Sequence, residues 1–481
     1  MDEVPEDTIC AIATPAGDGG IGIVRISGPG ALAIAEKVLR LRSNQSLRRV
    51  PSHTLHLADI LAPERSSEYT DSVENRTRLS DRVIDEALVV FMKGPRSFTA
   101  EDVVEIHCHG SGVVLGRVCD ACVSVGARLA QPGEFTKRAF LNGRLDLSQA
   151  EAVLDTIKAK SDVGLRIAQR HLRGELGQQV DRLRTRLLGM LARIEAGIDF
   201  VEEDISFIGR EELIRSLQEA LAEISAMLAT AEGGRVLREG ARVVIVGRPN
   251  VGKSSLLNRL LRKDRAIVTD IPGTTRDVIE ESVVWDGLMI TLVDTAGLRD
   301  TTDVVEQEGI NRTRSAQKDG DMVLHLLDAT ELNEKGLGEF VPLPDGRRAL
   351  VLINKCDLVD NASSQRLAGA VEERTRYKVL PISVRTGAGV EELKRSISSQ
   401  LSQASFESNE GVVITNVRHR LALERTRLSI QEALDSTRRG IEPECVAVDL
   451  RGAGDSLGEI TGVITSDEIL DRIFSEFCIG K

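Results

Sequence analysis

The chain has 481 residues, 41% of them hydrophobic and 28% charged, which is enough for about three domains of ordinary size. A formal net charge of −12 excludes nucleic-acid binding by a basic field spread over the whole protein and leaves only local patches for that purpose. Met1 to Asp7 is acidic and the apolar run Ile9 to Ile12 is short, so we expect a cytosolic protein without a membrane span, whose seven cysteines are reduced.

Residues 1–146 have the pattern of a mixed α+β domain. Ile21 to Ile26 and Glu86 to Phe91 resemble strands, and Val103 to His107 precedes a helical stretch that contains glycines. The polar segment 63–81, rich in Ser, Glu and Arg, is typical of a flexible hairpin insertion.

Cys119 and Cys122 form a Cys-x-x-Cys, and His107 and His109 lie shortly before it, so a zinc site is conceivable. There is no second Cys-x-x-Cys, and the run 112–129 has the pattern of an amphipathic helix that places the two cysteines one turn apart. The sequence therefore favours small buried thiols.

From Ser148 to about Ala229 the pattern is helical, with a break near 200–209. The stretch 158–193 carries nine basic residues against three acidic ones. Arg166, Arg170 and Arg173 follow i, i+4, i+7 spacing, so they could share a helix face and contact successive phosphates of a nucleic acid. A solvated helix face that pairs with acids elsewhere is an equally open interpretation.

An apolar strand, Val243 to Val246, is followed by Gly-Arg-Pro-Asn-Val-Gly-Lys-Ser at 247–254, a complete G-x-x-x-x-G-K-[ST] phosphate loop. Its glycines let backbone N–H groups surround phosphates, Lys253 can reach the β- and γ-phosphates, and the Ser254 hydroxyl can ligate Mg²⁺. A helix-compatible run follows the loop, as this motif requires. The predicted ligand is a nucleoside triphosphate.

A second apolar run ends in Asp-Thr-Ala-Gly at 294–297, where Asp294 can hold Mg²⁺ through water and the Gly297 N–H can sense the γ-phosphate. A third ends in Asn-Lys-Cys-Asp at 354–357, and the Asp357 carboxylate can accept both N1–H and N2–H of guanine. Adenine offers no such pair of donors. These motifs at successive strand ends predict a Ras-like guanine-nucleotide domain of α/β fold.

A fourth apolar run ends in Ser383 and is followed by Val-Arg-Thr-Gly, where GTPases usually carry Ser-Ala-Lys. Between the phosphate loop and Asp294, the segment 269–277 is placed to be a switch loop, and Thr275 is the expected Mg²⁺ ligand in it.

Leu298 follows the Asp-Thr-Ala-Gly motif, so the glutamine that orients attacking water in Ras-like enzymes is missing. The side-chain oxygen of Asn250, with backbone oxygens of a switch loop, could hold a monovalent cation as a fixed positive charge against the phosphates. As a plain loop residue, Asn250 would only cap the turn.

Gly233, Gly234 and Gly240 mark the start of this nucleotide domain, and the polar segment 402–411 marks its end. The runs 421–434 and 466–477 are again helical. The simplest topology is a helical domain made of two separated segments, with the nucleotide domain inserted between them. The expected boundaries are 1–146, 147–238, 239–402 and 403–481.

Together these features resemble the tRNA-modification GTPases of the MnmE or TrmE family over essentially all 481 residues. The segments that carry the resemblance are 13–15, 19–28, Pro-Gly-Glu-Phe-Thr at 132–136, 141–147, Gly-Thr-Thr-Arg-Asp at 273–277, 294–299 with Glu306, and Cys-Ile-Gly-Lys at 478–481.

The resemblance implies K⁺-stimulated GTP hydrolysis, in which Glu306 orients the water in place of glutamine. The implied K⁺ ligands are Asn250, Thr269, Ile271 and Thr274, and the implied Mg²⁺ ligands are Ser254 and Thr275. The residues expected to contact GTP or its metal ions are Gly247, Asn250, Val251, Gly252, Lys253, Ser254, Ser255, Thr269, Asp270, Ile271, Pro272, Gly273, Thr274, Thr275, Asp294, Thr295, Ala296, Gly297, Asn354, Lys355, Asp357 and Ser383.

The resemblance also implies that the N-terminal domain binds a one-carbon tetrahydrofolate, either 5-formyl or 5,10-methylene, through Arg25, Glu105, Arg144 and Lys481. The three cations can neutralise a glutamate tail or polarise a formyl oxygen, and Glu105 can accept from the pterin amino group. Cys478 is then a candidate nucleophile or acid/base. By itself, a terminal Cys-x-Gly-Lys would be a frayed tail with a reactive thiol.

The implied function is that of a cytoplasmic homodimer that works on tRNA with an FAD-dependent partner of the MnmG family, in a heterotetramer or larger complex. It would add a carboxymethylaminomethyl or aminomethyl group to C5 of the wobble uridine, with tetrahydrofolate as the carbon source and glycine or ammonium as the nitrogen source. GTP turnover, with the nucleotide domains meeting across K⁺, would be coupled to the folate site.

Two other functions remain open. A ribosome-assembly switch GTPase would need a dedicated RNA-binding domain after the nucleotide domain, and residues 412–481 show neither a G-x-x-G clamp nor a basic charge. A folate-dependent one-carbon transferase with a regulatory nucleotide domain would leave the basic stretch 158–193 unused.

Overall fold

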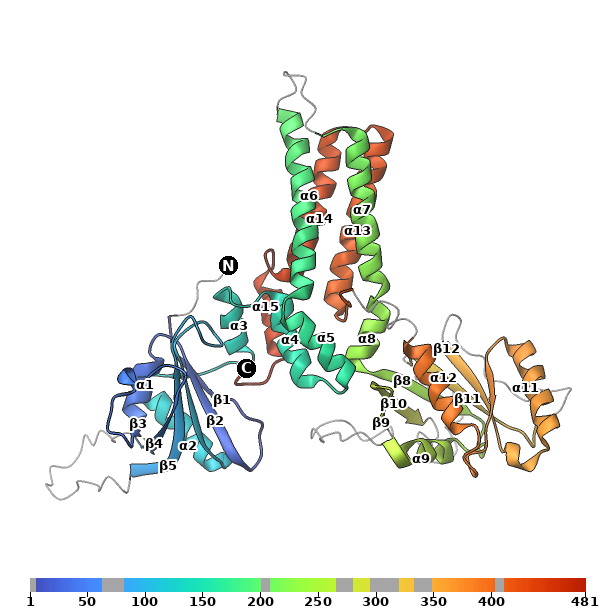
Figure 1. The fold of residues 1–481 in the computed structure, drawn as a ribbon, viewed down its shortest axis with the longest axis horizontal. Helices are drawn as coiled ribbons and strands as arrows, with labels where there is room; N and C mark the ends of the chain where they lie inside the picture. The colour runs from blue at the N-terminus through green and yellow to red at the C-terminus, as the bar shows by residue number, and fades with distance from the viewer. Residues whose placement is uncertain are drawn as a thin grey trace, which may run out of the picture. The chain divides into compact units, whose positions relative to one another are not determined.

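The structure, a computed structural model, describes residues 6–62, 82–199, 208–264, 280–294, 320–332, 348–402 and 411–481 (Figure 1). The hairpin insertion expected at 63–81 lies outside these ranges. The chain divides into two compact units. Unit 1 comprises residues 1–154, 171–181 and 458–481, and unit 2 comprises 155–170 and 182–457.

Unit 1 is built on a seven-stranded sheet in the order β3-β4-β5-β6-β2-β1-β7, in which only β1 and β7 are parallel neighbours. Its strands are β1 (Ile9–Ile12), β2 (Gly19–Ser27), β3 (Leu39–Leu41), β4 (Leu55–Leu61), β5 (Val83–Met92), β6 (Val103–Gly110) and β7 (Arg128–Leu129). The three strands predicted from the sequence fall within β2, β5 and β6, which confirms the α+β class.

Helices α1 (Ala31–Val38) and α2 (Gly112–Ser124) form the core of unit 1 with one face of this sheet. Cys119 and Cys122 are buried on α2, as the helical pattern predicts. Contact with Cys10 and burial raise the pKa of the Cys119 thiol, and burial raises the pKa of Cys122 to about 12. Both side chains are therefore neutral thiols at physiological pH.

A second apolar cluster in unit 1 joins sequence-distant helices. The helices are α3 (Glu134–Leu141), the first part of α4 (Leu147–Lys158) and α15 (Asp467–Ser475). Phe474 and Phe477 pack against Leu147 and Leu154 in this cluster. Asp146 begins α4 with a capping box, since its side chain accepts from the Gln149 N–H at 2.8 Å while the Gln149 side chain accepts from the Asp146 N–H at 2.9 Å.

A buried ion network around Arg138 on α3 ties three segments of unit 1 together. The Arg138 side chain is 1% exposed and contacts the carboxylates of Asp7, Glu101 and Glu134. Removal of this cation would break the ion pair of Glu101, a 10% exposed carboxylate, and would leave Asp7 and Glu134 with Arg128. Loss of a partner at a buried pair costs far more than loss of a surface pair.

We expect Arg138→Ala to lower the free energy of unfolding of unit 1 by about 3–5 kcal/mol, as measured by urea denaturation. Arg42→Ala, at an exposed ion pair, is the control and should leave the midpoint nearly unchanged. Burial alone would raise the pKa of Glu134. Hydrogen bonds from Arg128, Gln131 and Arg138 together lower it by more, so the net shift of the pKa is downward. Stability from this carboxylate is therefore present above about pH 4.5 and is lost as the pH falls through its lowered pKa. An unchanged midpoint in Arg138→Ala would contradict a structural role for the network.

Unit 2 contains a six-stranded sheet in the order β13-β12-β11-β8-β10-β9, with β9 as its antiparallel edge and the other neighbours parallel. Its strands are β8 (Ala241–Gly247), β9 (Glu280–Trp285), β10 (Leu288–Asp294), β11 (Met322–Asp328), β12 (Arg348–Asn354) and β13 (Val379–Pro381). Helices α9 (Lys253–Asp264), α11 (Asn361–Thr375) and α12 (Val390–Ser402) flank the sheet (Figure 1). Every residue of β11 is buried, as expected for a central parallel strand.

The rest of unit 2 is helical and comes from both sides of the sheet segment in sequence. Four long helices lie side by side: α6 (Glu175–Asp199, from Arg182 onward in this unit), α7 (Arg210–Ala229), α13 (Val417–Arg439) and α14 (Pro443–Thr461, to Leu457 in this unit) (Figure 1). Ion pairs Arg193–Glu212 and Arg451–Glu195 join α6 to α7 and to α14. Shorter helices α5 (Asp162–Leu172) and α8 (Ala231–Glu239) precede the sheet. The nucleotide domain is thus inserted into a helical one, as predicted.

Within the described residues, no helix combines the length and the apolar character that crossing a membrane requires.

Candidate functional site

The phosphate loop connects β8 to α9, and its glycines are needed where the loop turns. Gly247 has φ +149, and a Cβ there would lie 2.4 Å from the Leu326 carbonyl oxygen. Gly252 has φ +105, and a Cβ there would lie 2.5 Å from Nδ2 of Asn354. Both positions require glycine because the backbone conformation and the close approach each exclude a side chain.

Lys253 and Ser254 begin α9 and are placed as the motif predicts. Lys253 Nζ donates to the carbonyl oxygens of Gly247 at 2.9 Å and Arg248 at 2.7 Å, so the ammonium lies across the loop. The Ser254 hydroxyl donates to Asp294 Oδ2 at 2.7 Å. A hydroxyl and a carboxylate are the hard oxygen donors that Mg²⁺ prefers, so these two residues fit the ion expected there.

The base-recognition residues converge on the same edge of the sheet. Asn354 donates to the Val251 carbonyl oxygen at 2.8 Å and accepts from the Val384 N–H at 3.0 Å, which joins the phosphate loop to the segment after β13. The Ser383 hydroxyl donates to Asp357 Oδ1 at 2.6 Å, and Arg385 forms an ion pair with Oδ2 of the same carboxylate. The hydrogen bond from Ser383 and the Arg385 guanidinium hold the pKa of Asp357 below its usual range, so the carboxylate is ionised and oriented.

A cavity of about 580 Å³ joins these motifs, a size that suits a small organic ligand. Its lining includes Asn250, Gly252, Asn354, Lys355 and Asp357. Asn250 has φ +64, in the left-handed region that asparagine tolerates, and it lies at the wall of this cavity. The sequence prediction that these residues form one pocket is consistent with this geometry.

Several predicted site residues lie outside the described ranges. They are Thr269, Asp270, Ile271, Pro272, Gly273, Thr274, Thr275, Thr295, Ala296, Gly297 and Glu306. The expected water-orienting acid and most of the expected K⁺ ligands therefore stay predictions.

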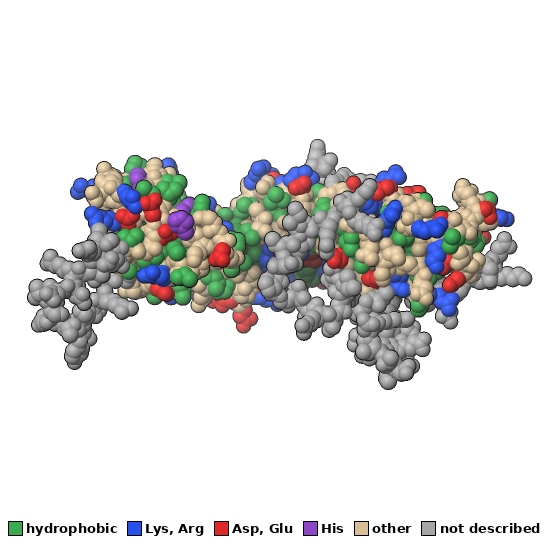
Figure 2. All heavy atoms as spheres, turned by 90° about the horizontal axis from the view of Figure 1, so that it is seen from below, with side chains coloured by type: hydrophobic (Ala, Val, Ile, Leu, Met, Phe, Trp, Pro, Cys, Tyr) green, Lys and Arg blue, Asp and Glu red, His purple; other side chains and the backbone are tan. Residues whose placement is uncertain are grey.

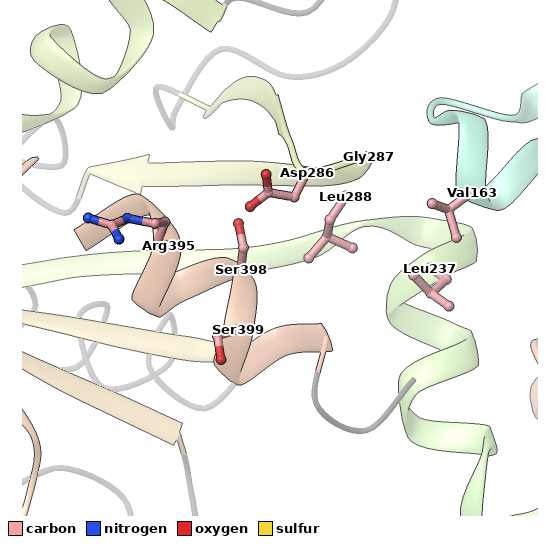
Figure 3. A pocket seen from close by; sticks show the side chains of 8 residues that line it. All are labelled: Val163, Leu237, Asp286, Gly287, Leu288, Arg395, Ser398 and Ser399. Atoms are coloured by element: carbon pink, nitrogen blue, oxygen red, sulfur yellow. The ribbon is translucent and has the colours of Figure 1, made fainter. Parts of the chain in front are cut away.

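A second cavity in unit 2, of about 310 Å³, is not part of this pocket (Figure 3). It lies between α5, α8, α12 and the β9–β10 turn, and Figure 3 shows Asp286, Ser398 and Arg395 along one side of it. It shares no lining residue with the phosphate or base motifs.

Unit 1 brings together four residues that the sequence analysis named at distant positions. Arg25 on β2 lies directly opposite Glu105 on β6, and its Nε donates to Glu105 Oε1 at 2.9 Å. A second guanidinium nitrogen of Arg25 donates to the Gly480 carbonyl oxygen at 3.3 Å, next to Lys481. Burial and nearby Arg25 lower the pKa of the Lys481 ammonium, against smaller opposing effects of Glu105 and Cys478.

Phe98 connects the two arginines of this cluster and was missed by sequence analysis. The guanidinium carbon of Arg25 lies 5.4 Å from the centre of the Phe98 ring, and that of Arg144 lies 5.2 Å from the same centre. Arg144 also donates to the Phe98 carbonyl oxygen. The ring therefore holds two cations near each other through cation–π contacts.

His107 was also missed as a member of this cluster. Its Nε2 lies 3.2 Å from Glu105 Oε2. The signal was available, because residues two apart on a strand share a face.

The terminal segment is packed into unit 1, so the frayed-tail interpretation was wrong for its backbone. Gly480 has φ +96, and a Cβ there would lie 2.3 Å from the Ile12 carbonyl oxygen. Phe477 is buried, and the Gly133 N–H donates to the Cys478 carbonyl oxygen at 3.5 Å. The Cys478 side chain is exposed, so its thiol is accessible beside the cluster.

Arg166, Arg170 and Arg173 of the basic stretch 158–193 do not share the single helix face that their spacing suggested. Helix α5 ends at Leu172, and Arg173 lies in the turn that follows. Arg170 donates to the Gly411 carbonyl oxygen at 3.3 Å. Arg184, Arg186 and Arg193 also have hydrogen-bond or ion-pair partners on neighbouring helices. On the face drawn in Figure 2, basic and acidic side chains are intermixed.

Comparisons with known proteins cover nearly the whole chain. Residues 8–144 match the family model of the GTP-binding protein TrmE N-terminus, and residues 147–478 match that of the MnmE helical domain. A protein named tRNA modification GTPase MnmE from Heliobacterium modesticaldum is 46% identical over 481 residues, with 99% of each chain covered. One of the same name from Clostridioides difficile is 43% identical over 477 residues, again with 99% of each covered. The FeoB G-domain structure from Methanococcus jannaschii is 26% identical, with 34% of this chain and 97% of that chain covered and a TM-score of 0.26. With near-complete coverage at this level of identity, the chain belongs to the MnmE (TrmE) family of tRNA modification GTPases.

Proposed function

We propose that this chain is a K⁺-stimulated GTP hydrolase that modifies C5 of the wobble uridine of tRNA with a carbon taken from tetrahydrofolate. It acts as a homodimer with an FAD-dependent MnmG-type partner in the cytoplasm. The observation that carries the proposal is the presence in one chain of two separate polar clusters, the nucleotide pocket of unit 2 and the cluster of Arg25, Glu105, Arg144 and Lys481 in unit 1. The proposed division of labour is folate binding and dimerisation by 1–146, GTP turnover by 239–402, and a helical scaffold from 147–238 and 403–481.

In the nucleotide pocket, the residues of this chain bind and orient GTP. The Lys253 ammonium, which donates to loop carbonyl oxygens in this structure, turns to the β- and γ-phosphates when GTP binds. The Asp357 carboxylate, held by Ser383, accepts from the guanine N1–H and N2–H. Ser254 with Thr275 would hold Mg²⁺, and Asn250 with switch-loop oxygens would hold K⁺. When bound, these cations would supply positive charge that stabilises the transition state. Glu306 orients the attacking water.

In the unit 1 cluster, charge complementarity supports the folate proposal. Arg25 and Arg144 lie over one ring, and Lys481 is close enough to Arg25 for the two charges to interact, so the cluster offers three cations for the carboxylates of a glutamate tail or a formyl oxygen. Glu105 is the acceptor for the pterin amino group. Cys478 offers an exposed thiol next to these groups as nucleophile or acid/base.

Exposed leucines on the unit 1 sheet support dimerisation through this unit. Leu55 and Leu57 on β4 are 55% and 41% exposed, and Leu88 on β5, directly opposite Leu57, is 43% exposed. Adjacent apolar side chains of this size on a sheet face are typical of an interface. The segment after the nucleotide domain forms α13 and α14 of the helical bundle, which weighs against a ribosome factor with a separate RNA-binding domain there.

We expect GTP turnover in K⁺ to exceed that in Na⁺, at equal ionic strength, by about tenfold or more, because a held cation stabilises charge that develops on the phosphates. Asn250→Ala should lose this stimulation. Asn258→Ala, which changes another asparagine of the same cavity outside the motifs, is the matched control and should keep it. Equal slow rates in both salts would instead indicate a switch GTPase that needs a protein activator.

A further inference from the structure

Strand β6 carries two histidines on the same face of the unit 1 sheet, each beside a different carboxylate. Glu105, His107 and His109 alternate with the buried residues of this strand, so they lie on the face opposite its core side. His107 Nε2 lies 3.2 Å from Glu105 Oε2, whereas His109 Nδ1 lies 2.9 Å from Asp85 Oδ1. The His107 side chain is 25% exposed and that of His109 is 72% exposed. His109, which contacts a different carboxylate, can therefore serve as a control for His107.

The two oxygens of Glu105 face different partners. Oε1 accepts from Arg25 Nε at 2.9 Å and lies 2.9 Å from a second guanidinium nitrogen of Arg25. Oε2 faces His107. A donor on a bound ligand therefore competes with His107 for Oε2, because Oε1 is already held by a permanent cation.

The strength of this competition depends on the charge of His107. A neutral imidazole donates a hydrogen bond to the carboxylate. An imidazolium adds a full positive charge to this bond, which strengthens it, and it offsets the negative charge that would attract an amino donor. Protonation of His107 therefore weakens the hydrogen bond that Glu105 can accept from a ligand.

Other charged or titratable groups lie on the strand of His107, on the adjacent strands β2 and β5, and on the terminal segment that contacts Arg25. They are Arg25, Asp85, Glu86, Glu105, His109, Cys478 and Lys481. All of these remain in a variant that changes His107 alone. The difference between that variant and the unmodified chain then isolates the effect of His107.

We propose that His107 is a positioning residue of this site, and that its protonation weakens binding of a tetrahydropterin ring by engaging Glu105. The inference rests on the proposed one-carbon function of unit 1 and adds pH control to it. The proposed effect acts on the pterin amino group, because that group would donate a hydrogen bond to Glu105.

The test is the dissociation constant of 5-formyltetrahydrofolate for the full chain, measured by calorimetry at pH 7.5, 6.5 and 5.5 at constant ionic strength. This range brackets the usual titration of histidine, near pH 6.5. His107→Gln can still donate to Glu105 but does not titrate, and His109→Gln is the matched control. Binding by the unmodified chain and by His109→Gln should weaken about three- to tenfold from pH 7.5 to 5.5, and binding by His107→Gln should change less than about twofold.

Retention of the full pH dependence in His107→Gln overturns the proposal. Tighter binding at low pH also overturns it, because His107 would then be attracting the acidic glutamate tail. If the unmodified chain binds no folate at any pH, the proposed one-carbon function is wrong as well. If it binds folate but His107→Gln keeps the pH dependence, only the role of His107 is wrong. Matched thermal midpoints confirm that each variant is folded, and His107→Asn replaces His107→Gln if the latter is not.

Discussion

Replacing Asp357 by Asn should convert the nucleotide pocket from guanine to xanthine recognition. The ionised Asp357 carboxylate can accept both N1–H and N2–H of guanine, whereas an Asn amide presents a donor to the guanine amino group. Xanthine carries a carbonyl at that position, and Asn can donate to it while its oxygen still accepts from N1–H. We expect GTP affinity to fall by at least about 100-fold and XTP to become the preferred ligand.

The measurement is competition of GTP and XTP for the chain, followed with a fluorescent guanine nucleotide and its xanthine counterpart. Asp360→Asn is the control. Asp360 lies three residues further on and caps α11 by accepting from the Ser363 N–H at 2.9 Å, a role that Asn fills equally well. The Asp360→Asn variant should therefore prefer GTP, as the unmodified chain does. If Asp357→Asn still prefers GTP, Asp357 does not read the base.

The nucleotide pocket could be predicted because its chemistry is local in sequence. Each motif follows an apolar strand, and parallel strands bring their carboxyl ends to one edge of the sheet. The contacts of Asn354 with the phosphate loop and with Val384 follow from that rule once the strands are recognised. What sequence alone did not give was Arg385 as the partner of Asp357, since an exposed arginine after a strand has many possible partners.

The unit 1 cluster could not be derived from spacing. Arg25 and Glu105 are paired only because β2 and β6 are neighbours in the sheet, and Lys481 reaches them from the other end of the chain. Resemblance to a family supplied those residues, not physical reasoning from the sequence. Phe98 had no signal, because a phenylalanine in a loop is normally part of a core.

The helix end at Leu172 shows the opposite case, in which an available signal was overlooked. Gly174 has φ +84, and glycine in this conformation commonly ends a helix. The Arg166–Arg170–Arg173 spacing was extended to the residue directly before that glycine, where the helix has already ended, so the predicted basic face included a residue that is not on the helix. Hydrophobic or charge periodicity has to be interpreted together with the residues that end a helix, such as glycine.

Glu105→Gln should weaken binding of 5-formyltetrahydrofolate by about 10- to 100-fold, because the amide oxygen stays with Arg25 and an NH2 donor replaces Oε2, the oxygen that would accept from the pterin amino group. The substitution keeps the shape of the side chain and an oxygen that can accept from Arg25, so the local packing is retained. What changes is the negative charge between Arg25 and the ligand.

Glu86→Gln is the matched control for this charge, since Glu86 is a 48% exposed acid on the adjacent strand β5 that pairs with Arg42 and not with Arg25. Its folate affinity should stay within about twofold of the unmodified chain, as expected for an exposed surface pair. Calorimetry at pH 7.5 measures both. Equal affinities for Glu105→Gln and Glu86→Gln would show that Glu105 serves only to hold Arg25, and that the pterin finds its acceptor elsewhere. A selective loss in Glu105→Gln would place the pterin amino group against β6, within reach of the His107 side chain that shares this carboxylate.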